Sequence, residues 1–420
     1  MLHARTTHSA AFRLLALIGC VLWPALSLAH GERAQEPSLR LSTIQWYDTR
    51  WSAPRISVNQ ELVVTGRFHI MSSWPLEIPS PATLTFLNVD VPGPVFTRAA
   101  SEVNGVNGVA SMALQPGGDY AYRIVLRGRL PGRYHVHPML DVLDAGAILG
   151  PGQWVTIEGD PTSFQDWITT LTGQHLDLAR YGLPHVIVWH VVWIVLAIAW
   201  LGYWIRKPLL IPRYEAIQRG DGDRLITRSD RMMAAVMLAA TMAVAIIGFA
   251  ATNVANPVTI PLQSHQTRVA PLDEPIAPIT IAPLNVTYLV PGRTVQFRVR
   301  VTNHGTQPVR FGEFTTANLR FLDAAVSRPA PDYPSDLVAP AGLLVRPPTP
   351  IAPGESVERY LEATSPVWET DRLTALMSDP TSRIGGLFMF YDRAGNRSIV
   401  EFSSSIVPTF ADRQQDQSGG

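Results

Sequence analysis

Two long apolar stretches constrain the fold of this chain most, because each is long enough to cross a lipid bilayer. They cover residues 186–205 and 232–252, and about 20 apolar residues in a helix span the roughly 30 Å of hydrocarbon in a membrane. The polar segment between them carries seven Lys or Arg residues against four acidic ones. Since positively charged loops stay in the cytoplasm, the sequence predicts transmembrane helices at 184–205 and 232–252, joined by a cytoplasmic loop at 206–231.

The first 29 residues have the pattern of a secretory signal peptide. A positively charged start precedes an apolar run over residues 14–22, and Ser27-Leu28-Ala29 is a small-x-small cleavage site. Cleavage there would make His30 the first residue of the mature protein and would place the regions flanking the hairpin on the outer side of the membrane. A rival interpretation is a lipoprotein signal, which would leave a lipidated Cys20 at the N-terminus.

Cysteine and charge usage exclude several classes of protein. Cys20 is the only cysteine among the 420 residues. If it leaves with the signal peptide, the mature chain can form no disulfide, iron–sulfur cluster, thiolate zinc site or blue-copper centre. The 34 basic and 34 acidic residues cancel, so no basic excess indicates nucleic acid as a partner.

Both regions outside the hairpin contain short strand-like segments separated by turns rich in proline and glycine. This spacing is typical of β-sandwiches. The predicted fold class is therefore mainly β, with two β-sandwich domains (30–183 and 253–413) on the outer side, the transmembrane hairpin between them and a polar tail at 414–420. The predicted strands are 39–47, 61–70, 82–87, 120–127, 132–138 and 153–157 in the first domain, and 287–290, 294–301, 318–322, 356–361 and 386–391 in the second.

The strand that starts at Gly132 carries the strongest sign of chemistry, because His135 and His137 are two positions apart. Residues two apart on a strand point to one face, about 6.5–7 Å from each other, so the two imidazoles form half of a metal site. The α-amine and ring of His30 could supply the remaining nitrogen donors, and such donors suit Cu(II) in a roughly planar arrangement. Zinc is an open alternative, as is a plain polar strand face. For His69, on another strand, the simpler interpretation is a ring that bonds a backbone carbonyl.

Several motifs together resemble the B subunit of the copper membrane monooxygenases, the family of particulate methane monooxygenase and ammonia monooxygenase. The resemblance covers about residues 30–410. Its motifs are His30-Gly31-Glu32, Ile44-Gln45-Trp46-Tyr47-Asp48, Pro92-Gly93-Pro94-Val95-Phe96, His135-Val136-His137, Gly150-Pro151-Gly152-Gln153-Trp154, Gly312-Glu313-Phe314-Thr315 and Gly385-Gly386-Leu387.

The resemblance implies two cupredoxin-like domains and a copper site in the first of them. By position, the copper ligands would be His30, also through its free amine, with His135 and His137. Some methane-oxidising members have a second copper site made by two further histidines. His69 matches one of these, but the other position is Gln45, and an amide is a poor substitute for imidazole, so we expect this second site to be absent or weak.

The resemblance also implies an activity and a setting. The complex would use O₂ to oxidise methane to methanol or ammonia to hydroxylamine, with the integral-membrane A and C subunits as partners, a trimer of such heterotrimers and an electron donor such as a quinol. It would lie in a bacterial inner or intracytoplasmic membrane, with both β domains on the periplasmic side.

Two other roles stay open from the sequence. The chain could be a non-catalytic membrane-anchored scaffold with structural copper, the chemistry being carried by the C subunit. It could also be a copper chaperone, although chaperones use soft ligands for Cu(I) and Met139 is the only methionine close to His137.

Overall fold

A computed structural model describes most of the chain between residues 37 and 409. The described residues form two compact units, one from those up to Pro161 and after His265, the other from those within Thr162–Ser264. The predicted signal peptide, His30 and the tail at 414–420 lie outside the described residues. These are 37–108, 111–170, 173–205, 207, 210–255, 266–273, 275, 277–289, 293–326, 333–366, 368 and 383–409.

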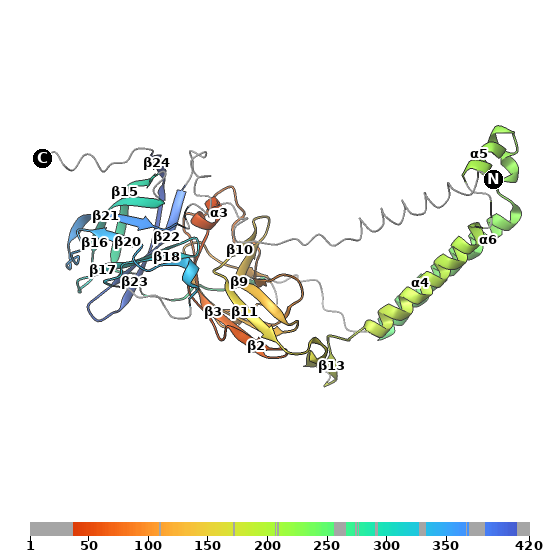
Figure 1. The fold of residues 1–420 in the computed structure, drawn as a ribbon, viewed down its shortest axis with the longest axis horizontal. Helices are drawn as coiled ribbons and strands as arrows, with labels where there is room; N and C mark the ends of the chain where they lie inside the picture. Colours follow the sequence, from red (N-terminus) through yellow and green to blue (C-terminus); the bar gives the residue numbers. More distant parts are fainter. Residues whose placement is uncertain are drawn as a thin grey trace, which may run out of the picture. The chain divides into compact units, whose positions relative to one another are not determined.

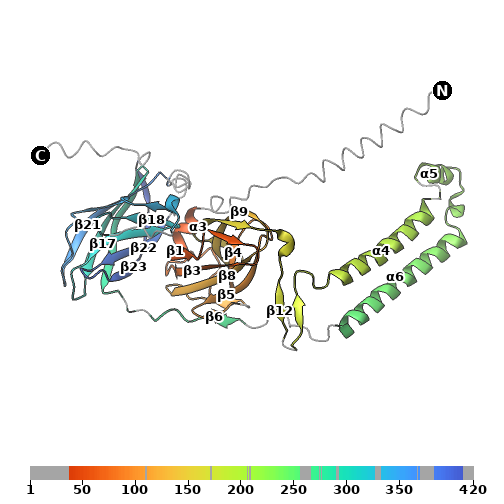
Figure 2. The ribbon, with the colours of Figure 1, turned by 60° about the horizontal axis from the view of Figure 1, so that its bottom comes forward.

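The first unit contains an N-terminal β-sandwich whose two sheets enclose one apolar core (Figures 1 and 2). One sheet has the order β1-β3-β8-β5-β6, and the other has the order β14-β7-β4-β9-β11-β2 with β10 also paired to β9. Alternate residues of each strand face the core, for example Val136 and Leu140 of β9. The strands are β1 (Ile44–Trp51), β2 (Arg55–Ser57), β3 (Glu61–Ile70), β4 (Thr85–Asp90), β5 (Phe96–Val103), β6 (Val106–Asn107), β7 (Met112–Ala113), β8 (Asp119–Gly128), β9 (Gly132–Val142), β10 (Gly146–Leu149), β11 (Gln153–Glu158) and β14 (Thr267–Arg268).

The same unit contains a C-terminal β-sandwich with sheets of order β20-β21-β16-β15-β24 and β19-β18-β17-β22-β23. Phenylalanines from both sheets meet in its core, where the ring centroids of Phe297 and Phe314 lie 5.0 Å apart and those of Phe314 and Phe388 lie 4.6 Å apart. The elements are β15 (Ile279–Leu289), β16 (Thr294–Asn303), β17 (Arg310–Thr316), β18 (Leu319–Leu322), η3 (Ser335–Leu337), β19 (Val338–Ala339), β20 (Leu343–Arg346), β21 (Ser356–Thr364), β22 (Arg383–Tyr391), β23 (Arg397–Ser405) and β24 (Val407–Thr409).

Two short segments cross between the sandwiches and correct the predicted boundaries. The predicted strand 39–47 begins only at Ile44, because the preceding residues form the helix α3 (Pro37–Ser42). Leu41 of this helix is buried in the core of the C-terminal sandwich. Conversely, β14 follows the hairpin in sequence but pairs with β7 of the N-terminal sandwich. Each sandwich is therefore completed by residues that the sequence assigned to the other one.

The second unit contains two helices that are long and apolar enough to cross a membrane, α4 (Leu183–Trp204) and α6 (Arg228–Ala255). They pack side by side (Figure 2), with Trp189 against Gly248. The segment predicted as a plain loop contains a further helix. The remaining elements are η1 (Pro161–Ser163), β12 (Trp167–Thr169), β13 (His175–Asp177), α5 (Ile211–Gln218) and η2 (Gly222–Arg224).

A capping box explains why α6 begins before the predicted start at residue 232. The backbone N–H of Thr227 donates to Asp230 Oδ2 at 2.8 Å, and the N–H of Asp230 donates to Thr227 Oγ1 at 3.3 Å. Asp230 also accepts the Tyr203 hydroxyl at 2.7 Å and pairs with Lys207 at 3.0 Å. These contacts join the two helices at their loop ends.

The predicted fold class, mainly β with two sandwiches and an apolar helical hairpin, is confirmed.

Candidate metal centre

The histidine pair lies where one edge of β9 changes partner. Gly132–Val136 pairs with β11, whereas residues from Met139 onward pair with β10. The segment Gly150-Pro151-Gly152, which connects β10 to β11, therefore passes His137. His135 and His137 share the face of β9 opposite to its core residues, as the strand periodicity predicts.

The two imidazoles point their nitrogens at each other. His137 Nε2 lies 2.7 Å from His135 Nδ1, and the ring planes are nearly perpendicular, at 86°. On the other side of its ring, His137 Nδ1 donates to the carbonyl of Gly150 at 2.9 Å. Because a carbonyl can only accept, the proton of a neutral His137 sits on Nδ1, and the lone pair of Nε2 faces His135.

Burial favours this neutral form of His137, which is 4% exposed. Burial lowers the pKa of His137, against the opposing effects of the Gly150 carbonyl and of the carboxylates of Asp90 and Asp336. A neutral imidazole is the form that binds a metal ion. At neutral pH the His137 ring is therefore already in the uncharged form that a metal site would require.

Gly152 has no side chain, and this leaves space for the His137 ring. A Cβ atom at position 152 would lie 2.1 Å from His137 Cε1 and 2.4 Å from Nε2, far inside van der Waals contact. The His135 ring packs against Trp154, with centroids 4.9 Å apart, and the Arg133 guanidinium lies 4.8 Å from the Trp154 centroid. The lack of a side chain at Gly152 thus gives the His137 ring its space, and Trp154 limits the movement of the His135 ring.

The two nitrogens are close enough to be ligands of one metal ion. Metal–imidazole bonds of about 2.0–2.1 Å hold adjacent nitrogens about 2.8–3.0 Å apart at right angles and about 3.3–3.4 Å apart in a tetrahedron. The observed 2.7 Å is slightly shorter than the first of these distances, and nitrogen donors of this kind suit Cu(II). Without metal, the same distance suits an N–H donated by His135 Nδ1 to His137 Nε2.

The structure brings two of the three predicted copper ligands together, and His30 lies outside the described residues. Within the described part of the chain, no group of three or more His, Cys, Asp or Glu side chains is arranged to hold a metal ion. The third ligand, His30, stays a prediction.

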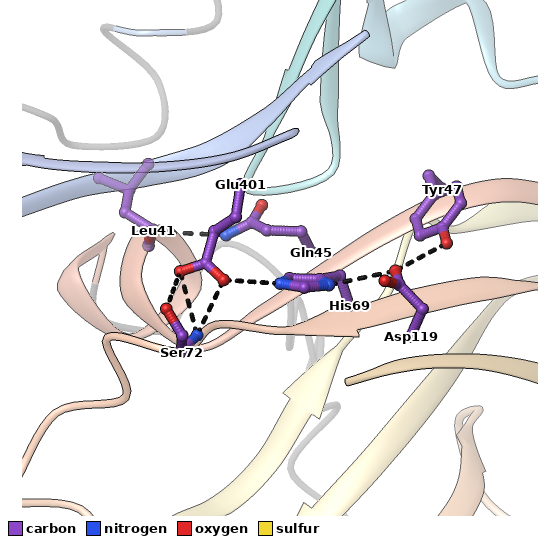
Figure 3. A network of polar contacts seen from close by, with 7 residues as sticks. All are labelled: Leu41, Gln45, Tyr47, His69, Ser72, Asp119 and Glu401. Atoms are coloured by element: carbon purple, nitrogen blue, oxygen red, sulfur yellow. Dashed lines mark hydrogen bonds and ion pairs between the residues drawn. The ribbon is translucent and has the colours of Figure 1, made fainter. Parts of the chain in front are cut away.

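His69 occupies a different environment from the one predicted (Figure 3). Its ring bonds two carboxylates instead of a backbone carbonyl: Nδ1 lies 3.1 Å from Asp119 and Nε2 lies 2.8 Å from Glu401. Burial opposes the charge on His69, but these two carboxylates outweigh it and raise the pKa of His69 to about 9. At neutral pH both ring nitrogens donate, so neither presents a lone pair to a metal.

The side chain of Gln45 is also used in hydrogen bonds to other groups. It lies directly across from His69 in the β1–β3 pairing, but its amide bonds backbone groups at the junction of the two sandwiches. Nε2 donates to the carbonyl of Arg40 at 3.1 Å, and Oε1 accepts the backbone N–H of Ala317 at 3.0 Å. Sequence reasoning missed Asp119 and Glu401. Asp119 is the register partner of His69 on β8, whereas Glu401 comes from the other sandwich and no local pattern pointed to it.

Two β-sandwiches, a pair of apolar helices and a strand that brings two imidazoles together define a β protein with a membrane-length hairpin and a candidate nitrogen-donor site. The sequence model of the monooxygenase B-subunit protein family matches residues 31–410. The chain belongs to this monooxygenase B-subunit family. It is 39% identical over 403 residues to the "Particulate methane monooxygenase alpha subunit" of Methylococcus capsulatus (Bath), covering 96% of this chain and 97% of that protein.

Among solved structures, the cupredoxin domain of amoB from Nitrosocaldus yellowstonii aligns with 18% identity and a TM-score of 0.24. The alignment covers 32% of this chain and 98% of that domain. A score this low carries no conclusion about the fold or the chemistry of either sandwich.

Proposed function

We propose that this chain is the copper-binding B subunit of a membrane-bound monooxygenase complex. The copper would be held by His135 Nδ1, by His137 Nε2, and by His30 through its ring and its free α-amine. The observation that carries this proposal is the 2.7 Å approach of two imidazole nitrogens in a chain of the monooxygenase B-subunit family. His69 is left out of the proposed site, because both of its nitrogens bind carboxylates.

Bound copper would supply a redox-active centre that can take part in the activation of O₂. Residues of this chain orient the two imidazoles that would hold the copper. The Gly150 carbonyl keeps the proton of His137 on Nδ1, and Trp154 restricts the His135 ring. The substrate we propose is methane, oxidised to methanol, following the name of the relative from Methylococcus capsulatus. Ammonia, oxidised to hydroxylamine, is the alternative.

The proposed setting is a bacterial inner or intracytoplasmic membrane, spanned by α4 and α6, with both sandwiches on the periplasmic side. Both helices leave most of their apolar side chains exposed within this chain. In a bilayer these faces would contact lipid and the integral-membrane A and C subunits. We further propose a trimer of such heterotrimers and a quinol as electron donor.

One observation favours a second candidate, a scaffold whose copper is structural. His137 lies close to the junction of the two sandwiches. It bonds the carbonyl of Gly150, and the preceding residue, Leu149, accepts a hydrogen bond from Asn318 of the C-terminal sandwich. A metal at this position would stabilise the junction. The chemistry would then reside in the C subunit.

Metal analysis of the purified complex separates these functions. Loss of about one copper per B subunit together with activity in His137→Ala would support a functional copper centre in this chain. Loss of copper with activity retained would support the scaffold. Zinc in place of copper in the wild type would refute the proposed metal.

A further inference from the structure

The C-terminal sandwich reaches the histidine pair through the turn between β17 and β18. This turn consists of only Ala317 and Asn318, and both have positive φ, at 47° and 72°. Two-residue hairpin turns with positive φ at both central positions match the twist of the flanking strands, and asparagine tolerates this conformation well. Asn318 is 2% exposed, so the turn is buried against the N-terminal sandwich.

Three hydrogen bonds to other described residues hold the turn. The Ala317 N–H donates to Gln45 Oε1 at 3.0 Å, and Tyr333 donates its hydroxyl proton to the carbonyl of Asn318 at 2.9 Å. The Asn318 side chain then donates from Nδ2 to the carbonyl of Leu149 at 3.0 Å, across 169 positions of sequence. All three bonds are buried or partly buried, where a polar group left without its partner costs about 1–3 kcal/mol.

The Leu149–Gly150 peptide group is therefore held at both ends. Its oxygen accepts from Asn318, and its N–H donates to the carbonyl of Pro138 at 2.7 Å. A planar peptide held at both ends has a fixed orientation. One residue further on, Gly150 precedes Pro151, which restricts the Gly150 backbone as well, and the Gly150 carbonyl accepts the Nδ1 proton of His137.

We propose that Asn318 is a positioning residue for the metal centre, acting on His137 from the other sandwich. It fixes the Leu149–Gly150 peptide, this peptide sets the direction of the Gly150 carbonyl, and the carbonyl sets the tautomer and tilt of His137. The inference rests on the proposed copper site. It implies that the centre is completed by the C-terminal sandwich, although none of the proposed ligands comes from that sandwich.

The test is Cu(II) binding and EPR of the purified full complex carrying Asn318→Asp. Aspartate tolerates the left-handed backbone but has no N–H to donate to Leu149. We expect Cu(II) affinity to fall tenfold or more, the usual effect of losing a partner that orients a ligand, together with a changed copper hyperfine splitting. An affinity within twofold of the wild type and an unchanged spectrum would overturn the inference.

Asn303→Asp is the matched control. Asn303 is also buried in the C-terminal sandwich, and its Nδ2 donates to the carbonyls of Gln307 and Ile351 at 2.9 and 3.0 Å. This variant loses the same kind of donor without touching Leu149, so its EPR spectrum should match the wild type. A spectrum that changes as much as that of Asn318→Asp would overturn the inference, because general loosening of the sandwich would then explain both.

Two further variants keep the result decisive. If Asn318→Asp does not assemble, Asn318→Gly retains the left-handed turn and removes only the side chain, and the same loss of affinity is expected. His137→Ala separates the two proposals. Copper retained in His137→Ala would overturn the proposed function and this inference together. Copper lost in His137→Ala but unaffected in both Asn318 variants would overturn this inference alone.

Discussion

Nε2 of His69 lies 2.8 Å from Oε2 of Glu401, although the two residues are 332 positions apart and belong to different sandwiches. Glu401 also accepts the hydroxyl and the backbone N–H of Ser72, at 2.7 and 3.0 Å. A second ion pair between the sandwiches joins Asp48 to Arg397. The junction that positions the candidate metal centre is therefore held by charges as well as by apolar packing.

Glu401→Gln should destabilise this junction. The variant removes one of the two negative charges that hold the buried imidazolium of His69, and we expect a loss of about 2–3 kcal/mol in the free energy of unfolding. Denaturant unfolding of the full chain in detergent measures it. Glu358→Gln is the control, because Glu358 pairs with Arg298 and Arg300 on the exposed surface, where salt bridges contribute little. Equal losses in the two variants would contradict this assignment.

The stability of the junction between the two sandwiches should depend on pH. The pKa of His69 is raised from 6.5 to about 9, so its contribution is complete below pH 6.5 and is lost as the pH rises through about 9. This difference corresponds to about 3 kcal/mol. Burial alone would raise the pKa of Asp119 and Glu401, but His69 helps to hold both below their usual range; their contribution is lost as the pH falls through these depressed values.

Melting temperatures between pH 5 and pH 10 test whether stability falls as the pH rises, as predicted. The wild type should be most stable between about pH 5 and 6.5 and should lose stability toward pH 9 and above. Glu401→Gln should show a shallower decline over the same range. A wild-type melting temperature that stays constant or rises from pH 6.5 to pH 10 would contradict the assigned charge of His69.

Gly152→Ala should disrupt the histidine pair with little effect on the fold. The new Cβ would lie 2.1–2.5 Å from three atoms of the His137 ring, so the ring must rotate away from His135. We expect Cu(II) affinity to fall at least tenfold, measured by competition with a chelator. Gly222→Ala is the control, since its Cβ would meet nothing within 4 Å. Unchanged copper affinity in Gly152→Ala would show that His137 is not a ligand.

Much of the fold followed from the sequence because its signals are local. The alternation in 61–70 matches β3, and the hairpin followed from apolar length alone. The predictions failed where distant residues decide. Residues 39–42 are helical rather than extended, because Leu41 completes the core of the other sandwich. A smaller error is local: the predicted strand 82–87 begins only at Thr85.

The same distinction holds for the site. The pairing of His135 with His137 follows from strand periodicity, which any strand obeys. The bond from His69 to Glu401, and the link from Asn318 to Leu149, depend on contacts between residues 169 or more positions apart. A single sequence contains no periodicity that reports such contacts.

The most direct test of the central claim is the copper content and Cu(II) EPR spectrum of the purified complex, compared between the wild type, His137→Ala and His175→Ala. His175 is an exposed histidine on β13 and serves as the control. Our account predicts that His137→Ala loses about one copper per B subunit and the corresponding nitrogen-ligated signal, whereas His175→Ala keeps both. Full copper content and an unchanged spectrum in His137→Ala would contradict the account.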